Sequence, residues 1–500
     1  MVYTFLVYET KDVYVETKRD FVIKAHLQSG DFVIYSVLNY GDFVMRCGMS
    51  EVKLKRKIYD ELLKWKNEYA TEYALFIKGA RRVGKTTIAE DFGNKEYKSF
   101  VTINFQSAND TIRDLFVNSL LDLDYLYNVI QMQYGAKLYN RESLVILDEI
   151  QLFPKARQAL KTLLTDGRYD FIETGSLAGI KKKSERTEIL IPSEEYAIEM
   201  FPLDFEEFLW ALGDEMTMPI IKNSYEKMNA LGSLHRDIFR KFREYMCVGG
   251  MPQAVVKYAE GKDFEKVDFV KKEILALYRN DIKNQEEENS NYVGNILDNI
   301  PSELSKHEKS STFKLSHVDK NARYREYSGP LNWLAEAMIV NVARNVTDPS
   351  PALTLNMDDE RFKCYLLDTG LLINLSFGDG SYMDNEFYKA ILTDKLHINE
   401  GMFVENVVAQ CLRSNGHKIL FHVEYNDNGK PVMEIDFIIR KNRKIIPIEA
   451  KSGKTFAIKS LRNFKAKFTN RVGMQYVLYD GDIKRDGEII YLPYYMAAIL

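Results

Sequence analysis

Between residues 73 and 175, short apolar runs alternate with segments whose apolar residues recur at helical spacing. Apolar runs of this kind predict strands buried on both faces, as in a parallel sheet. Their alternation with helices is typical of an α/β fold with a doubly wound parallel sheet. The expected strands are Ala74–Ile77, Phe100–Phe105, Leu144–Leu147 and Tyr169–Thr174.

Helical patterning replaces this alternation in residues 216–290. A break at Gly249-Gly250-Met251-Pro252 divides the region into helices, which we expect to form a lid over a bound ligand of the sheet domain. Residues 49–215 precede the lid and form the expected sheet-containing core.

Residues 291–347 carry apolar helical stripes followed by a short strand, an order typical of a winged-helix-like module. Such a module would present Lys320, Arg323 and Arg325 to DNA. A packing module that relays the state of its neighbour is the alternative, because charged clusters are usually just solvated. A Pro-rich boundary at residues 348–351 precedes the last unit, residues 355–500.

The first 48 residues alternate apolar and polar positions and carry no chemical motif. The alternation predicts an accessory β-rich piece ahead of the helical pattern that begins after residue 49. A second hypothesis places the start of translation at Met49, so that this piece would not belong to the native protein.

A glycine-rich loop follows the first expected strand, with the spacing G-x-x-x-x-G-K-[ST]. This spacing lets backbone N–H groups point at phosphate oxygens, next to the N-terminus of a helix. Lys85 is placed to reach the β- and γ-phosphates, and the Thr86 hydroxyl to bind Mg²⁺. A surface turn is the alternative, which the preceding strand disfavours. The loop predicts ATP and Mg²⁺ as cofactors, bound by Gly79, Ala80, Arg81, Arg82, Val83, Gly84, Lys85, Thr86 and Thr87.

An acidic pair, Asp148 and Glu149, ends the third expected strand. Buried parallel strands end where the phosphates of a bound nucleotide lie, so Asp148 is placed to hold the Mg²⁺. Glu149 is placed to polarise an attacking water as a general base. The alternative is that the two acidic residues end the strand by chance. The glycine-rich loop upstream favours a catalytic role for them. The pair therefore predicts ATP hydrolysis rather than ATP binding alone.

Ser176 follows the end of the fourth expected strand. A polar side chain there would lie beside the γ-phosphate and could sense it. A helix N-cap or turn residue is an equally good interpretation of this serine.

The last third of the chain carries a second set of candidate residues. Glu405 lies in an amphipathic helical pattern. Asp436 lies within an expected strand, Val432–Arg440, which a polar turn returns as a second strand with Glu449 and Lys451. Glu449 and Lys451 are two positions apart and therefore share a strand face. In a hairpin, Asp436 would lie beside them.

Two carboxylates and a lysine at the end of an apolar hairpin suit metal-dependent hydrolysis of a phosphodiester. Asp436, Glu449 and Glu405 would hold Mg²⁺, and Lys451 would orient or deprotonate the water. A solvent-facing strand edge with mixed charges is the alternative. Residues 441–471 are strongly basic, which fits either a phosphate backbone or a solvated helix face.

Composition excludes several classes of protein. The 500 residues are 46% hydrophobic and 28% charged, with a formal net charge of −4, which rules out a uniformly basic coat for nucleic acid. The four cysteines lie far apart, so a reducing cytoplasm without structural zinc is expected. We find no apolar stretch of transmembrane length and expect no membrane partner.

Taken together, these motifs resemble the bacterial and archaeal AAA-like P-loop ATPases that carry a C-terminal domain of unknown function with a PD-(D/E)xK nuclease-like core. The resemblance covers residues from about 49 to 500. It rests on the loop at 79–86, on Leu147–Gln151, on Thr174–Ser176, on Phe201–Phe208, on Gly249–Pro252 and on Phe362–Leu372.

The resemblance implies an ATPase core, a helical lid, a winged-helix-like module and a restriction-endonuclease-like α/β domain. It implies Lys85, Thr86, Asp148 and Glu149 as ATP-site residues and Ser176 as a sensor position. In the last domain it points to Glu405, Asp436, Glu449 and Lys451. The usual Pro-Asp of the nuclease motif is Ile435-Asp436 here.

Two functions are consistent with these residues. In the first, ATP hydrolysis is coupled to a nucleic-acid-directed C-terminal domain, with metal-dependent nuclease activity. In the second, the chain is an ATP-driven molecular switch whose C-terminal domain only binds DNA or a protein partner. A homo-oligomer is a further expectation.

Overall fold

The computed structural model describes a short N-terminal set of strands and most of the chain from residue 54 onward. The described ranges are 54–175, 193–284, 287–306, 312–318, 323–378, 383–393, 400–452 and 456–500. The chain forms two compact units, Met1–Lys53 and Leu54–Leu500. The predicted sensor Ser176 and the predicted DNA contact Lys320 lie outside the described residues.

The first unit is an antiparallel sheet in which each strand pairs with the next along the chain. Its strands are β1 (Thr4–Val7), β2 (Asp12–Glu16), β3 (Val22–Gln28), β4 (Asp31–Ser36) and β5 (Val44–Cys47). These strands fall in the segment where the apolar and polar positions alternate.

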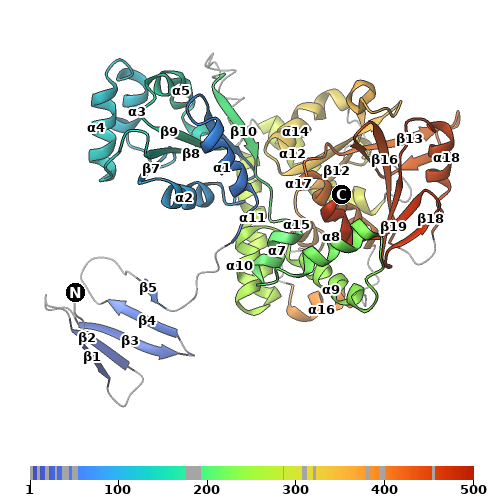
Figure 1. The fold of residues 1–500 in the computed structure, drawn as a ribbon, viewed down its shortest axis with the longest axis horizontal. Coiled ribbons are helices and arrows are strands. Elements are labelled where there is room, and N and C mark those ends of the chain that lie inside the picture. Colours follow the sequence, from blue (N-terminus) through green and yellow to red (C-terminus); the bar gives the residue numbers. More distant parts are fainter. Residues whose placement is uncertain are drawn as a thin grey trace. The chain divides into compact units, whose positions relative to one another are not determined.

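A parallel sheet lies in the first part of the second unit (Figure 1). Its spatial order is β10-β6-β9-β8-β7. Four of its strands agree with the expected ones to within one residue at each end, whereas the fifth, β10, had no counterpart in the sequence analysis. The strands are β6 (Ala74–Lys78), β7 (Ser99–Asn104), β8 (Ser143–Asp148), β9 (Asp170–Gly175) and β10 (Glu195–Glu199).

Helices cover both faces of this sheet, because side chains of successive strand residues point to opposite faces. Leu75 and Ile77 pack on one face with α1 (Ile58–Glu68) and α2 (Lys85–Glu96). The other face packs against three helices (Figure 1), namely α3 (Asp110–Asn118), α4 (Leu123–Tyr134) and α5 (Pro154–Asp166). A short 3₁₀ turn, Ile150–Leu152, follows β8.

A helical region follows the sheet, and its predicted break at residues 249–252 falls between α9 and α10. The helices are α7 (Phe205–Ala211), α8 (Thr217–Lys227), α9 (Ser233–Val248), α10 (Pro252–Gly261) and α11 (Phe264–Lys283), then α12 (Glu287–Ser305), α13 (Leu315–Val318) and α14 (Tyr324–Glu336).

Strands from both sides of the predicted boundary at residues 348–351 share one sheet, in the order β12-β11-β13-β14. The antiparallel pair β11–β12 follows α12, α13 and α14, which is the order expected of a winged helix; the winged helix itself stays a prediction. The strands are β11 (Val340–Val346), β12 (Met357–Leu366), β13 (Leu420–Tyr425) and β14 (Pro431–Ile435), and a 3₁₀ turn spans Leu353–Asn356.

A second C-terminal sheet has the order β15-β16-β17-β19-β18. The single strand expected up to Arg440 is two strands, β14 and β15, which join different sheets on either side of Asp436. The strands are β15 (Phe437–Lys441), β16 (Lys444–Ala450), β17 (Gln475–Tyr479), β18 (Lys484–Asp486) and β19 (Ile489–Pro493). The remaining helices are α15 (Thr369–Phe377), α16 (Asn385–Leu392), α17 (Glu400–Ser414), α18 (Lys459–Lys467) and the 3₁₀ helix Tyr494–Ile499.

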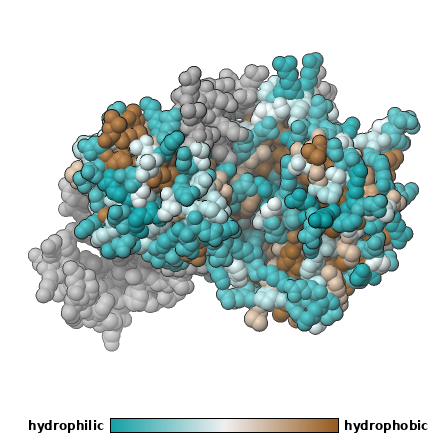
Figure 2. Space-filling model, turned by 45° about the horizontal axis from the view of Figure 1, so that its top comes forward, coloured by the Kyte–Doolittle hydropathy of each residue, from teal (hydrophilic) through white to brown (hydrophobic). Residues whose placement is uncertain are grey.

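The outer surface of α3 and α4 exposes apolar side chains (Figure 2). Leu121 is fully exposed and Met132 is 72% exposed, whereas Leu126 and Ile130 on the opposite side of α4 are buried. Contiguous apolar surface is typical of contact regions. The homo-oligomer nevertheless stays a prediction.

Within the described ranges, we find no helix with the length and apolar character that crossing a bilayer requires.

The turn between α9 and α10 is packed against two other segments. The N–H of Gly250 donates to Asp368 Oδ2 at 2.5 Å, and Asp368 also caps α15 by accepting from the N–H of Leu371. A Cβ on Gly250 would lie 2.1 Å from the carbonyl oxygen of Leu203. The chain at this junction is therefore too close for any side chain.

We predict that Gly250→Ala lowers the free energy of unfolding by about 2 kcal/mol or more, because the added methyl group forces the backbone at Leu203 to move. Urea denaturation measures this. Gly261→Ala is the matched control: nothing lies within 4 Å of its Cβ position at the end of α10, so it should be neutral or slightly stabilising. Equal effects of the two changes would contradict the close packing.

Lys271 of α11 is a fully buried cation at the same junction. Its Nζ donates to the Cys247 carbonyl at 2.9 Å and to the Tyr388 hydroxyl at 2.7 Å. Burial lowers the pKa of Lys271 to about 8, although the nearby Asp268, Cys247 and Asp368 favour its charged form. In the unfolded chain the pKa returns to its usual 10.5.

Between these two pKa values the folded chain binds fewer protons than the unfolded chain, so Lys271 makes the unfolding free energy rise with pH. We expect a rise of about 2 kcal/mol from about pH 8 to about pH 10. Denaturation curves of Lys271→Met should lack this contribution. Lys257→Met, which removes a lysine at the surface of α10, should keep the wild-type pH dependence. If both variants followed the wild-type curve, the pKa of Lys271 would not be lowered.

Candidate functional site

The glycine-rich loop folds as a phosphate cradle at the N-terminus of α2. Gly84 precedes the helix with φ 97°, a left-handed conformation that favours glycine. Gly79 approaches the backbone of Met200 so closely that a Cβ would lie 2.6 Å from the carbonyl oxygen. Arg82 and Thr87 are exposed, whereas Ala80 and Val83 are buried.

Lys85 lies at the centre of this loop and is buried. Its Nζ donates to the carbonyl oxygens of Gly79 and Ala80, each at 3.0 Å. Burial lowers the pKa of Lys85, while the nearby Glu149 and Asp148 favour the charged form. This ammonium group is poorly solvated, and the nearby carboxylates neutralise its charge only in part. It is therefore well placed to bind phosphate oxygens.

Asp148, at the end of β8, accepts hydrogen bonds from three elements. Thr86 Oγ1 of α2 and Asn104 Nδ2 of β7 each donate to its carboxylate at 2.7 Å. The hydroxyl of Thr174, in β9, donates to the same carboxylate. The predicted pair Thr86 and Asp148 is therefore brought together.

These groups fit a Mg²⁺ ion that is carried by a nucleotide. Such an ion keeps several waters and phosphate oxygens and needs one or two oxygen ligands from the protein. The Thr86 hydroxyl and the Asp148 carboxylate supply that chemistry. Among the described residues, no group of three or more His, Cys, Asp and Glu side chains could hold a metal ion by itself.

Glu149 is held in a left-handed backbone conformation, with φ 55°. Its carboxylate accepts from the side-chain amide of Gln151, and its N–H donates to Thr174 Oγ1 at 3.4 Å. A non-glycine residue in this conformation is uncommon and is often found at functional sites. Asn104, Thr174 and Gln151 were not predicted as site residues, although each is a polar residue at or just beyond a strand end.

The loop is tied to helix α11. Arg81 forms an ion pair with Asp281 at 2.7 Å, and the buried Tyr278 donates its hydroxyl to the Arg81 carbonyl at 3.0 Å. Burial raises the pKa of Asp281, and the negative charge of Glu149 raises it further. The positive charge of Arg81 has the opposite effect. Asp281 therefore lies within electrostatic range of Glu149.

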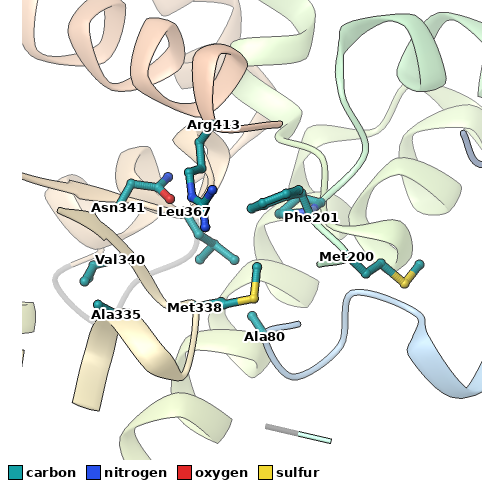
Figure 3. A pocket seen from close by; sticks show the side chains of 10 residues that line it. Ala80, Met200, Phe201, Ala335, Met338, Val340, Asn341, Leu367 and Arg413 are labelled. Atoms are coloured by element: carbon teal, nitrogen blue, oxygen red, sulfur yellow. The ribbon is translucent and has the colours of Figure 1, made fainter. Parts of the chain in front are cut away.

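A small pocket adjoins Ala80 of the loop (Figure 3). Arg413 of α17 points into it; its guanidinium pairs with Glu199 at the end of β10 and lies over the Phe201 ring. The pocket is lined by Ala80, Met200, Phe201, Pro202, Ala335, Met338, Val340, Asn341, Leu367 and Arg413. The C-terminal helix α17 thus reaches the edge of the sheet that carries the loop.

The C-terminal candidates are also brought together, but around an unpredicted lysine. Lys363 of β12 places its Nζ 2.8 Å from Glu405, 3.2 Å from Glu434 and 3.6 Å from Asp436. Burial opposes the charge of Lys363, but Glu405 and its other neighbours raise its pKa well above the usual value.

Glu449 and Lys451 form an ion pair beside this group. Burial and the negative charge of Asp436 raise the pKa of Glu449 to about 8, against the opposing effect of Lys451. Glu449 Oε1 is buried and has no hydrogen-bond partner in the described structure. The other oxygen of Asp436 accepts from the N–H of Ala450 at 2.9 Å.

The predicted ligands Glu405 and Asp436 do not fit a metal ion as they stand, because Lys363 Nζ lies 2.8 Å from Glu405 and 3.6 Å from Asp436. A buried ammonium group thus already neutralises the oxygens that a metal would need. The third predicted ligand, Glu449, is paired with Lys451.

Much of the basic stretch 441–471 is paired. Lys465 lies 3.2 Å from Glu488, Arg471 lies 2.5 Å from Asp348, and Lys467 contacts Glu424. Leu461 and Phe464 of α18 are buried. These three basic residues have acidic partners within the chain, and nucleic-acid binding stays a prediction.

Three segments of the chain match known domain families. Residues 71–209, which contain the loop, Asp148 and Glu149, match the family described as AAA domain. Residues 239–381 and 400–495 match two families described only as domains of unknown function, DUF8612 and DUF4143. No curated protein matches the chain significantly. The first match and the parallel sheet show an AAA-like P-loop ATPase domain.

Solved structures of low identity also align with the chain. They include a STAND signal-transduction ATPase with a tetratricopeptide repeat sensor from Pyrococcus horikoshii, at 12% identity and a TM-score of 0.25, covering 73% of this chain and 48% of that one. The ADP form of the Aeropyrum pernix ORC2 protein has 13% identity and a TM-score of 0.26, covering 69% and 96%. AMPPCP-bound DnaA from Aquifex aeolicus has 12% identity and a TM-score of 0.24, covering 58% and 89%.

The chain thus spans about half the length of the STAND protein. TM-scores of this size do not establish a shared architecture.

Proposed function

We propose that the chain binds and hydrolyses ATP with Mg²⁺, and that the bound nucleotide sets the conformation of the helical and C-terminal regions. The observation that carries this proposal is the convergence of Lys85, the Thr86–Asp148 pair and Glu149 at one edge of the parallel sheet. The match of this segment to an AAA domain supports it.

Each residue has a role that follows from its chemistry. The loop N–H groups and Lys85 bind the phosphates, and Thr86 and Asp148 hold the Mg²⁺, which neutralises charge on the phosphates. Glu149 accepts a proton from the attacking water. Thr174 and Asn104 orient Asp148, and Gln151 orients Glu149. Ser176 remains a proposed sensor.

Helix α11 is the route by which the nucleotide acts on the rest of the chain. ATP phosphates would attract Arg81 and repel the carboxylate of Asp281, so the Arg81–Asp281 ion pair and bound ATP compete. A ligand shifts a conformational equilibrium only through such differential contacts. The Arg81–Asp281 ion pair supplies such a differential contact.

The other end of α11 is joined to the C-terminal helices. Asp268, fully buried, accepts from Asn374 Nδ2 of α15 at 2.7 Å and from the Tyr388 hydroxyl of α16 at 3.0 Å. Lys271 binds the same Tyr388 hydroxyl. Movement of α11 at Asp281 is therefore passed to buried polar contacts that cannot break without cost.

The switch is favoured over the nuclease, because Lys363 lies 2.8 and 3.6 Å from two of the three predicted metal ligands, Glu405 and Asp436, and Lys451 pairs with the third, Glu449. A metal-dependent nuclease stays a prediction, as does binding of DNA, for which the exposed Arg323, just before α14, and Arg325, in its first turn, are candidates. Homo-oligomerisation and a cytoplasmic location are further proposals.

We predict that Lys85→Ala loses ATP binding and that Glu149→Gln keeps it but hydrolyses ATP roughly 100- to 10,000-fold more slowly, because the general base is removed. Binding of a fluorescent ATP analogue and release of phosphate measure the two steps. Glu142→Gln, just before the opposite end of β8, is the matched control and should hydrolyse ATP at the wild-type rate.

ATP hydrolysis at the wild-type rate by Glu149→Gln would show that the Glu149 carboxylate is not the general base. Tight ATP binding by Lys85→Ala would show that the loop is not the nucleotide site.

A further inference from the structure

Three carboxylates converge on one ammonium group in the C-terminal region. Glu405 comes from α17, Glu434 from β14 and Asp436 from the break between β14 and β15, and their oxygens lie 2.8, 3.2 and 3.6 Å from Lys363 Nζ. The Lys363 side chain is 1% exposed, so water does not solvate its charge. The carboxylates are its counter-charges.

A divalent cation would compete with Lys363 for the same oxygens. Mg²⁺ needs oxygen ligands at about 2.0–2.1 Å in near-octahedral geometry. A second cation within a few Å of a buried ammonium group is strongly disfavoured, because the repulsion is poorly screened. The metal could enter only if Lys363 left.

Lys363 also contacts an aromatic ring of the same sheet. Its Nζ lies 5.4 Å from the centre of the Phe421 ring on β13, which is separated from β12 by β11. Tyr365, on the same face of β12, donates its hydroxyl to the same Glu405 oxygen at 2.6 Å. Two side chains of one strand thus hold one carboxylate of α17.

The cluster also fixes a helix that reaches the ATPase domain. Glu405 and Arg413 lie eight residues apart on α17, a separation of about 12 Å along the helix. Glu405 is anchored by Lys363, and Arg413 is paired with Glu199 at the end of β10. Anchoring α17 at Glu405 therefore holds the contact at Arg413 in place.

We propose that Lys363 takes the place of the metal ion in this nuclease-like site, so that its ammonium group is the resident cation and the site serves to clamp α17 rather than to cleave phosphodiesters. This inference concerns the C-terminal region alone and does not depend on ATP hydrolysis. It makes the C-terminal carboxylates structural counter-charges of Lys363.

Binding of Mn²⁺ without nucleotide tests the proposal, in full-length chains that also carry Lys85→Ala so that the ATP site contributes nothing. With Lys363 present, we expect no Mn²⁺ site that depends on Asp436. Lys363→Met removes the ammonium at similar length and should raise Mn²⁺ affinity roughly 10- to 100-fold. Adding Glu405→Gln should abolish the gained site. Calorimetry measures each affinity.

Lys451→Met is the matched control, because it removes the neighbouring lysine and leaves Lys363 in the cluster; it should gain no Mn²⁺ site. Thermal melting gives a second readout: Mn²⁺ should raise the Tm of Lys363→Met but not that of the Lys363-containing chain. Mn²⁺ binding by the Lys363-containing chain that is lost on Asp436→Asn would overturn the proposal.

That measurement needs no Lys363 variant, so it decides the question even if Lys363→Met does not fold. Because no arm contains ATP, failure of this proposal is distinct from failure of the proposed ATPase.

Discussion

The carboxylate of Asp148 is the fixed point around which the candidate ATP site is built. It accepts hydrogen bonds from α2, β7 and β9, through Thr86, Asn104 and Thr174. A buried carboxylate without such partners would be costly, and each hydrogen bond to a charged group contributes about 1.5–3 kcal/mol. The three bonds therefore hold the loop helix and two strands in register at the edge where phosphates would bind.

The same constraint on buried charge links the ATPase domain to the rest of the chain. Lys271 and Asp268 are both fully buried on α11, and their partners come from α15, α16 and the end of α9. Lys363 links β12 to α17 in the same way, because its partner Glu405 lies on that helix. Because each of these charges needs its partners, a helix that moves must exchange one set of partners for another. Such exchanges make discrete conformational states rather than gradual deformation.

The sequence predicted the parts of the site that depend on local pattern. The loop spacing, the acidic pair after β8 and the four strands are each encoded within a few consecutive residues. Strand β10 was missed because its apolar run, Tyr196 to Ile198, is short and lies between two glutamates. Thr174 was read as part of a strand end, and only the packing of β9 beside β8 gives its hydroxyl a role.

Lys363 could not have been found in the same way. A lysine within the run from Phe362 to Leu366 looks like the exposed position of a strand, and its partner Glu405 lies 42 residues away. The break at Asp436 was also hidden, since the residues on both sides have strand patterns. Long-range pairing of charges, unlike hydrophobic periodicity, leaves no local signal in a single sequence.

The most direct test of the switch is amide hydrogen exchange in the last turns of α11, around Tyr278 and Asp281, in the Glu149→Gln chain with and without Mg²⁺ and ATP. If ATP competes for Arg81, exchange there should become faster while the loop at 79–86 becomes protected. Asp281→Asn should weaken the effect of the nucleotide on exchange. Asp298→Asn, which disrupts the surface ion pair between Asp298 of α12 and Arg279 of α11, should not. Protection of the loop with unchanged exchange in α11 would contradict the proposed coupling.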